Sequence, residues 1–197
     1  MLTLEKKKLE VPPELWEAWD RFRNIVKYGE PVLRQVAKPV TRINNETQLL
    51  VRRMIDTMRD ANGLGLAAPQ VGVSARVIVY DPLDKKGVRV LINPVILSMS
   101  GEQLEPEEGC LSIPGLVGKV KRAQEIKIKG YDERNHPIVR RVSGLEARVI
   151  QHEVDHLNGI LFIDRAEPGT IEWVIDGDDD DDDDDKEIEN EVVRKKA

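Results

Sequence analysis

The chain of 197 residues contains a single cysteine and no long apolar run. One cysteine cannot form a disulfide within the chain, which excludes the small disulfide-rich secreted proteins. No stretch approaches the roughly 20 apolar residues that a membrane-spanning helix needs. The first ten residues mix both signs of charge, unlike a signal peptide or a transit peptide. We therefore expect a protein of the bacterial cytoplasm, in preference to an organelle stroma, with no membrane association.

The sequence also lacks an excess of basic charge. Its net charge is −6, but Asp176 and residues 178–185 supply nine of the 36 acidic residues. Without them, 30 Lys and Arg face 27 Asp and Glu, so the remaining chain is nearly neutral. A nucleic-acid-binding body usually has a clustered basic face, so direct nucleic-acid binding is not expected. Because consecutive aspartates repel one another, we expect residues 176–197 to be a disordered tail, weakly helical at most beyond Lys186.

The pattern of apolar residues predicts one domain that contains helices and short strands. Apolar residues make up 40% of the chain, enough for one core. Leu50, Met54 and Met58 recur at every fourth position and predict a helix over residues 46–61. A shorter amphipathic helix is predicted over residues 12–24. Segments rich in Val and Ile predict strands over residues 76–80, 89–93, 95–97, 125–129 and 138–142.

A further helix has recognisable signals at both ends. Ser143 and Glu146 have the spacing of a capping box, and Gly159 is a typical stop signal. The apolar residues between them lie on several helical faces, which is typical of a buried helix. The predicted fold class is α+β, with a central helix enclosed by small, mostly antiparallel β-sheets.

The pentapeptide His152-Glu-Val-Asp-His156 lies within this central helix. Residues four positions apart share a helical face, so both imidazoles can bind one cation. Glu153 lies beside a ligand and can accept a proton from a metal-bound water. Two chance histidines on a buried helix are the alternative. The pattern favours a metal-binding central helix, but a catalytic metal needs a third protein ligand.

Cys110 is the candidate for the third ligand. A lone cysteine is more often a small buried apolar residue. Here it lies in a turn bounded by glycine and proline, and a thiolate with two imidazoles suits zinc or ferrous iron. No second cysteine exists to complete a closed structural site, so a fourth position would stay open for water. The third histidine, His136, lies in a polar turn and is interpreted as a solvated loop residue.

Three segments, at residues 63–70, 108–112 and 151–156, together resemble the three signature motifs of peptide deformylase. They occur in the family's order, and the similarity runs from about residue 25 to about residue 164, closest to the type-1 bacterial and plastid branches. The resemblance divides the chain into an N-terminal extension (1–24), a catalytic domain (25–175) and the acidic tail (176–197).

The resemblance implies a metal-dependent hydrolase that removes the N-formyl group from the formyl-methionine of new polypeptides and releases formate. It implies one divalent ion per chain, natively Fe²⁺ with Zn²⁺ or Ni²⁺ as substitutes, held by Cys110, His152 and His156. Glu153 would act as general base and then acid. Gln70 and the backbone N–H of Leu111 would hold the formyl oxygen.

The resemblance also implies how the substrate binds. The partners would be N-formyl-methionyl nascent peptides, which place the enzyme transiently near the ribosome. Gly65 would pair its backbone with the peptide, which binds as an extra strand. Leu64, Leu145 and Val149 would line the methionine pocket, and Arg148 would contact substrate or brace the site.

Two other functions remain open from the residues alone. Zinc endopeptidases share the His-Glu-x-x-His pattern but take their third ligand from downstream, where this chain offers only acids such as Asp164, Glu167 and Glu172. A structural metal-binding or interaction module would need a fourth ligand and would leave Gln70 without a role. Release of formate from a formyl-methionyl peptide separates the deformylase from both.

Overall fold

The computed structural model describes residues 9–103, 107–176 and 192–196. Its α-helices are α1 (Trp16–Arg21), α2 (Asn45–Asp60) and α3 (Gly144–Leu157). Its strands are β1 (Gly65–Ala67), β2 (Val77–Tyr80), β3 (Arg89–Gln103), β4 (Glu108–Cys110), β5 (Ile113–Gly118), β6 (Arg122–Tyr131), β7 (Pro137–Ser143), β8 (Glu172–Asp176) and β9 (Val192–Lys196). Short 3₁₀ turns cover Pro13–Leu15, Pro31–Arg34, Ala68–Val71 and Phe162–Asp164. The α+β fold class is confirmed.

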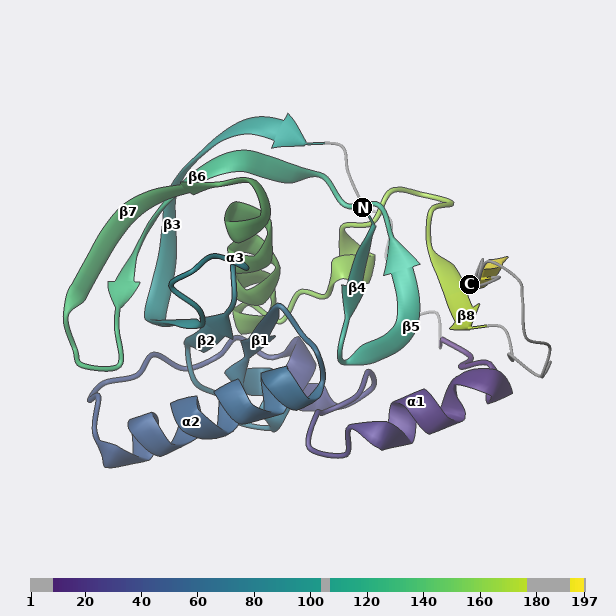
Figure 1. Ribbon diagram of the computed structural model, residues 1–197, viewed down its shortest axis with the longest axis horizontal. Helices are drawn as coiled ribbons and strands as arrows, with labels where there is room; N and C mark the ends of the chain where they lie inside the picture. Colours follow the sequence, from purple (N-terminus) through teal and green to yellow (C-terminus); the bar gives the residue numbers. More distant parts are fainter. Residues whose placement is uncertain (1–8, 104–106, 177–191, 197) are drawn as a thin grey trace.

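The larger sheet has the strand order β1-β2-β3-β6-β7, and every neighbouring pair is antiparallel. Its long strands β3 and β6 curve over α3 (Figure 1). Two register shifts in β3, after Ile92 and after Ile96, accompany this curvature because a bulge bends its strand. Ile126 and Ile128 of β6 pack with Ile150 of α3 in one buried cluster.

The smaller sheet has the order β4-β5-β8-β9 and lies on the other side of α3 (Figure 1). Leu116 of β5 and Trp173 of β8 are buried with Phe162 in a second apolar cluster. This sheet carries Cys110 at the end of β4. The central helix therefore lies between two sheets, and one of them brings the cysteine to it.

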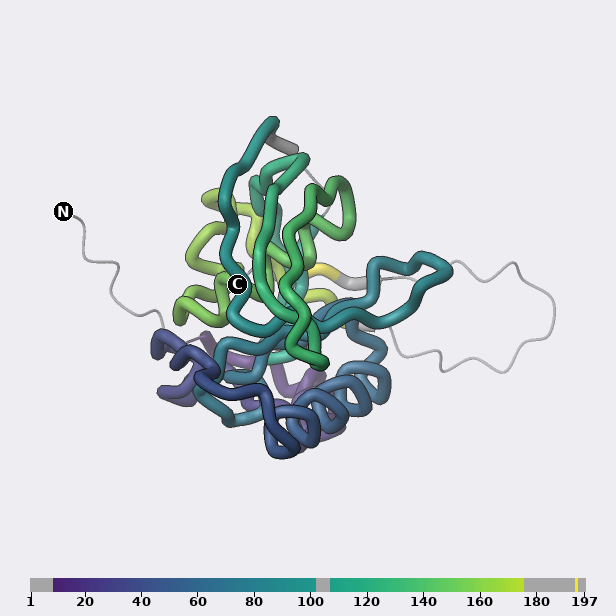
Figure 2. Tube along the Cα trace, turned by 90° about the vertical axis from the view of Figure 1, so that its left-hand side faces the viewer, coloured from purple at the N-terminus to yellow at the C-terminus, as the bar shows by residue number. Residues whose placement is uncertain are grey.

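Helix α2 lies beneath the larger sheet in both views (Figures 1 and 2). Asn44 caps its first turn, because its side-chain oxygen accepts a hydrogen bond from the Thr47 N–H at 3.0 Å. Met54 and Met58 are buried against Val77 of β2 in a third apolar cluster. Among the described residues, no helix combines the length and apolar character needed to cross a membrane.

The predicted elements are found with shifted bounds. The helix expected at 46–61 is α2, and that expected at 12–24 shortens to a 3₁₀ turn and α1. The strands expected at 89–93 and 95–97 are one strand, β3, because the break between them is a bulge. Strands β1, β4, β5, β8 and β9 were not predicted. His136 is a solvated turn residue, as expected, with a side chain 69% exposed.

Two predictions about local structure are wrong. The Ser143 side chain makes no capping hydrogen bond, so the capping box does not form. Glu146 instead accepts charge-assisted hydrogen bonds from Arg89 and Arg140, both at 2.6 Å, which are stronger than a bond to a backbone amide. The weak helix expected beyond Lys186 is also wrong for residues 192–196, which form β9 because β8 offers them an edge to pair with. Residues 177–191, where disorder was expected, lie outside the described residues.

Candidate active site

Cys110, His152 and His156 meet where the end of β4 approaches α3. One ligand atom from each lies within 4.8 Å of the other two, and Cys110 Sγ is 3.2 Å from His156 Nε2. The two imidazoles are one helical turn apart, with ring centroids 5.0 Å apart. A thiolate and two imidazoles at this spacing suit a single tetrahedral cation, whose bonds to such ligands are about 2.0–2.3 Å long. The donor set therefore fits a divalent metal ion.

Glu108 orients the first histidine. Its Oε2 lies 3.1 Å from His152 Nδ1, which leaves His152 Nε2 to face the metal position. Arg122 donates two hydrogen bonds to this carboxylate, both at 2.8 Å, and Arg148 donates a third at 2.6 Å. Burial would raise the pKa of Glu108, but the hydrogen bonds from Arg122 and His152 outweigh it and lower the pKa to about 2. The carboxylate is therefore held in its ionised form.

The sequence analysis did not identify this network. Arg122 also donates to Asp155 at 2.5 Å, so one guanidinium joins β4, β6 and α3 behind the metal position. Glu108 could have been suspected from its place two residues before Cys110. Arg122 gives no such signal, because only folding brings β6 beside β4.

Glu153 is a buried carboxylate that lines the cavity beside the metal position. The residue is 3% exposed, and its Oε2 has no hydrogen-bond partner among the described residues. Burial raises the pKa of Glu153 to about 7. A carboxyl group with this pKa can take up and release a proton near neutral pH.

Gly65 of β1 passes directly over this carboxylate. A Cβ atom at position 65 would lie 2.4 Å from Glu153 Oε1 and 2.8 Å from Val149 Cγ1. Only glycine therefore allows β1 to run this close to α3. Strand β1 pairs with β2 alone, so its other edge is open among the described strands.

Gln70 reaches the site from the 3₁₀ turn that follows β1. Its Oε1 accepts a hydrogen bond from the Ala67 N–H at 2.8 Å, so its Nε2 points the other way. That nitrogen donates to Ser112 Oγ at 3.3 Å and lies 3.7 Å from Cys110 Sγ. The Val26 N–H also donates to the Gln70 carbonyl at 2.8 Å, which fixes the turn.

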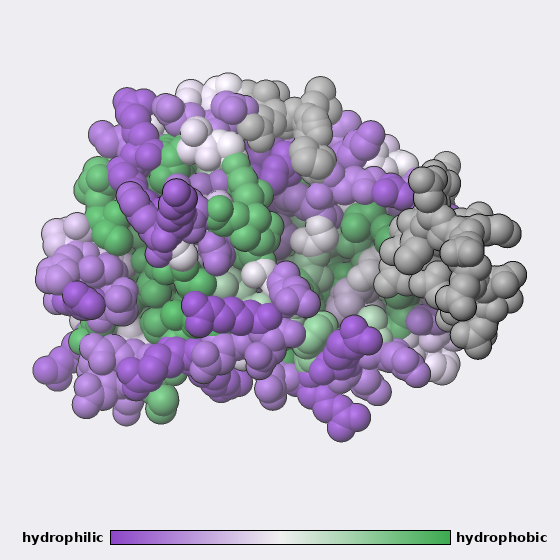
Figure 3. All heavy atoms as spheres, in the orientation of Figure 1, coloured by the Kyte–Doolittle hydropathy of each residue, from purple (hydrophilic) through white to green (hydrophobic). Residues whose placement is uncertain are grey.

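These residues surround a cavity of about 520 Å³ between the two sheets (Figure 3). The structure brings all the predicted site residues together, and all except His156 line the cavity. His156 is buried behind Cys110. Leu64, Gly65, Leu145 and Val149 form an apolar lobe next to Glu153. Leu111 lies beside Cys110, and Arg148 also reaches the cavity.

The acids that a zinc endopeptidase would need as a third ligand lie elsewhere. Asp164 accepts a hydrogen bond from the Leu161 N–H and pairs with Arg34. Glu167 pairs with Lys121, and Glu172 lies in β8. None of these acids joins the group formed by Cys110 and the two histidines among the described residues.

Comparisons with known proteins agree with this geometry. The family model described as polypeptide deformylase matches residues 22–171. A peptide deformylase of Halothermothrix orenii is 52% identical over 141 residues, which are 72% of this chain and 91% of that protein. A crystal structure of the Thermotoga maritima enzyme has a TM-score of 0.70 and 44% identity, over 73% of this chain and 97% of that one. A Synechococcus elongatus deformylase in complex with actinonin has a TM-score of 0.69 and 46% identity, over 73% and 80%. The chain belongs to the polypeptide deformylase family, metal-dependent hydrolases that remove the N-formyl group from nascent peptides.

Proposed function

We propose that Cys110, His152 and His156 hold one divalent ion, natively Fe²⁺, and that Glu153 moves the proton during deformylation. The observation that carries this proposal is a buried carboxylate with a free oxygen, Glu153 Oε2, in the same cavity as a thiolate and two imidazoles. The soft thiolate favours iron or zinc over a hard ion such as Mg²⁺. Zn²⁺ and Ni²⁺ are the expected substitutes.

The bound ion would supply Lewis-acid chemistry that activates water and polarises the formyl carbonyl. Glu153 takes a proton from the attacking water and later gives it to the nitrogen of methionine. The C–N bond breaks, and the products are formate and a peptide with a free N-terminus. The pKa of about 7 suits Glu153 to both transfers.

Two donors would stabilise the formyl oxygen as it becomes negative. Gln70 Nε2 is aimed at Cys110 by the bond between its Oε1 and Ala67. The backbone N–H of Leu111 follows the cysteine directly. Donors that are already oriented need little rearrangement during the reaction, which is why such groups are effective.

The apolar lobe would select methionine. Leu64, Leu145 and Val149 surround a space beside Glu153 that suits an unbranched apolar side chain. The open edge of β1 at Gly65 can pair with the peptide backbone as an added strand. The partners are formyl-methionyl nascent chains, so we place the enzyme near the ribosome in a bacterial cytoplasm.

We also assign the catalytic domain to residues 25–175, with the N-terminal extension before it and the acidic tail after it. The match of the family model to residues 22–171 supports this division.

Formate release tests the proposed function. Protein loaded anaerobically with Fe²⁺ should release one formate per formyl-Met-Ala-Ser consumed, and Zn²⁺ should support a slower rate. Unformylated Met-Ala-Ser should remain intact, whereas an endopeptidase would cleave it internally. Absence of formate release by protein that contains one metal ion per chain would refute the proposal.

A further inference from the structure

Five residues that line the active-site cavity have no part in the proposed binding of metal or methionine. They are Phe22 and, on β5, Pro114, Gly115, Leu116 and Val117, and we call the part of the cavity beside them its second lobe. Phe22 follows the end of α1, and the family-model match begins at Phe22, so α1 lies outside the matched region. The segment that precedes the matched region therefore leads directly into the wall of the cavity.

Helix α1 and the 3₁₀ turn before it pack against β5. The Trp19 Nε1–H donates a hydrogen bond to the carbonyl of Pro114 at 3.0 Å. Leu15 is buried and packs over Gly115, where a Cβ atom would lie only 2.7 Å from Leu15 Cδ1. Gly115 also has a φ of +79°, a backbone conformation that residues other than glycine rarely adopt. Pro114 and Gly115 of β5 thus form the contact surface for α1 and the turn before it.

Hydrogen bonds to its carbonyl fix the backbone position of Phe22. The Lys27 Nζ donates to the carbonyl of Phe22 at 2.7 Å and to that of Ile25 at 2.9 Å. The Ile25 N–H donates to the same Phe22 carbonyl at 3.0 Å. These bonds end α1 at a defined point and fix where the Phe22 side chain begins.

Unlike Leu15 and Trp19, Phe22 does not pack in an apolar cluster of the described residues. Leu15 and Trp19 pack in the apolar cluster of the smaller sheet. Phe22 belongs to none of the three apolar clusters of the described residues and is half-buried at the cavity instead. An aromatic ring fixed by its backbone but not used in packing is suited to contact a ligand.

The chemistry of the substrate limits what can occupy this lobe. The formyl group is the end of the substrate, so no residue precedes it. The methionine side chain takes the lobe beside Glu153. The remaining lobe can receive only a residue that follows methionine. A strand rises about 3.3 Å per residue, so the second or third residue is within reach.

We propose that Phe22 is a specificity-determining residue that receives an apolar or aromatic side chain downstream of the formyl-methionine. This proposal rests on the proposed function. It predicts that the enzyme discriminates among nascent chains by an element that lies at the end of its N-terminal extension.

The test compares Phe22→Ala with wild-type enzyme on three peptides: formyl-Met-Ala-Ser, formyl-Met-Phe-Ser and formyl-Met-Ala-Phe. Loss of one aromatic contact should raise KM about tenfold for at least one phenylalanine peptide, with kcat unchanged. KM for formyl-Met-Ala-Ser should change less than twofold. Phe22→Leu should restore part of the preference, because it keeps an apolar side chain, and it serves as the variant if Phe22→Ala fails to fold.

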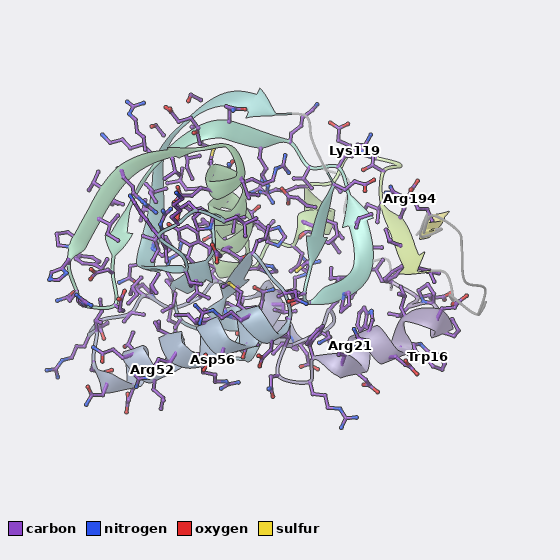
Figure 4. The ribbon with its side chains drawn as sticks, viewed as in Figure 1. Trp16, Arg21, Arg52, Asp56, Lys119 and Arg194 are labelled. Carbon is purple, nitrogen blue, oxygen red and sulfur yellow. The ribbon has the colours of Figure 1, made fainter. Side chains whose placement is uncertain are left out.

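Trp16→Ala is the matched control. Trp16 is an aromatic residue at the start of α1, but it is 62% exposed and does not line the cavity. Figure 4 labels it at the end of α1 opposite Arg21, the neighbour of Phe22. This variant should leave KM unchanged for all three peptides.

Two sets of results would overturn the proposal. Equal changes on all three peptides, or a fall in kcat alone, would give Phe22 a structural role. Unchanged KM and kcat for all three peptides would mean that the lobe receives no substrate residue. Failure of the proposed function is distinguishable, because wild-type enzyme would then release no formate from formyl-Met-Ala-Ser.

Discussion

Replacing Glu108 by Gln should destabilise the fold strongly, although the two side chains have nearly the same shape. The Glu108 side chain is 6% exposed and accepts three hydrogen bonds from two buried arginines, Arg122 and Arg148. The amide leaves both guanidinium groups without their shared counter-charge. Removing one partner from a buried ion pair costs about 3–5 kcal/mol. The pKa of about 2, against an ordinary 4.5, corresponds to about 3 kcal/mol at neutral pH, in agreement.

Urea denaturation of the metal-free protein measures this loss, because metal binding then cannot contribute to the stability. Glu107→Gln is the matched control, since it makes the same change one residue away. Glu107 pairs with Arg194 at the surface, where solvent screens the interaction, so its urea midpoint should stay close to wild type. Similar midpoints for Glu108→Gln and Glu107→Gln would refute the importance of the buried network.

The pH dependence gives a second check on the same variant. The pKa of Glu108 is lower in the fold than in the unfolded chain, so the ionised carboxylate stabilises the fold fully above pH 4.5. This contribution is lost as the pH falls through about 2. The stability curves of wild type and Glu108→Gln should therefore converge as the pH is lowered through this range. Curves that stay parallel would mean that the loss arises from shape and not from charge.

Four further predictions concern the catalytic groups and the C-terminal strand. Glu153→Gln should keep one metal ion per chain but lower kcat by about 10²–10⁴-fold, and near-normal turnover with full metal content would contradict its role as base. Cys110→Ser should lose the metal, because a hydroxyl is a weaker ligand than a thiolate; retained metal measured by atomic absorption would make the cysteine structural. Gln70→Ala should reduce kcat by about 10²–10³-fold without lowering the melting temperature, whereas loss of stability with full activity on cooling would indicate a purely structural amide. Deleting residues 192–197 should lower the melting temperature because the edge of β8 loses its partner, while kcat/KM stays within about twofold because the described lining of the cavity comes from other elements; a large loss of activity would show that β9 shapes the site.

The sequence by itself determined the parts of the site that are close together along the chain. His152, Glu153 and His156 fall on one helix at a spacing that has a direct geometric meaning. Leu50, Met54 and Met58 located α2 because the period of a buried helical face is local. Metal-ligand chemistry and its setting in a turn then pointed to Cys110, and the family motifs identified Gln70, although no local periodicity relates either residue to the histidines.

Only the tertiary structure decided the contacts between segments that are distant along the chain. Arg122 meets Glu108 because β6 and β4 both approach α3, and Phe22 lines the cavity because α1 is seated on β5. Glu146 left its expected capping role because folding brought Arg89 and Arg140 to it. Strand β9 forms only where β8 presents an edge. Pairings of this kind depend on the energies of groups that meet only after the chain has folded, so no pattern along the sequence records them.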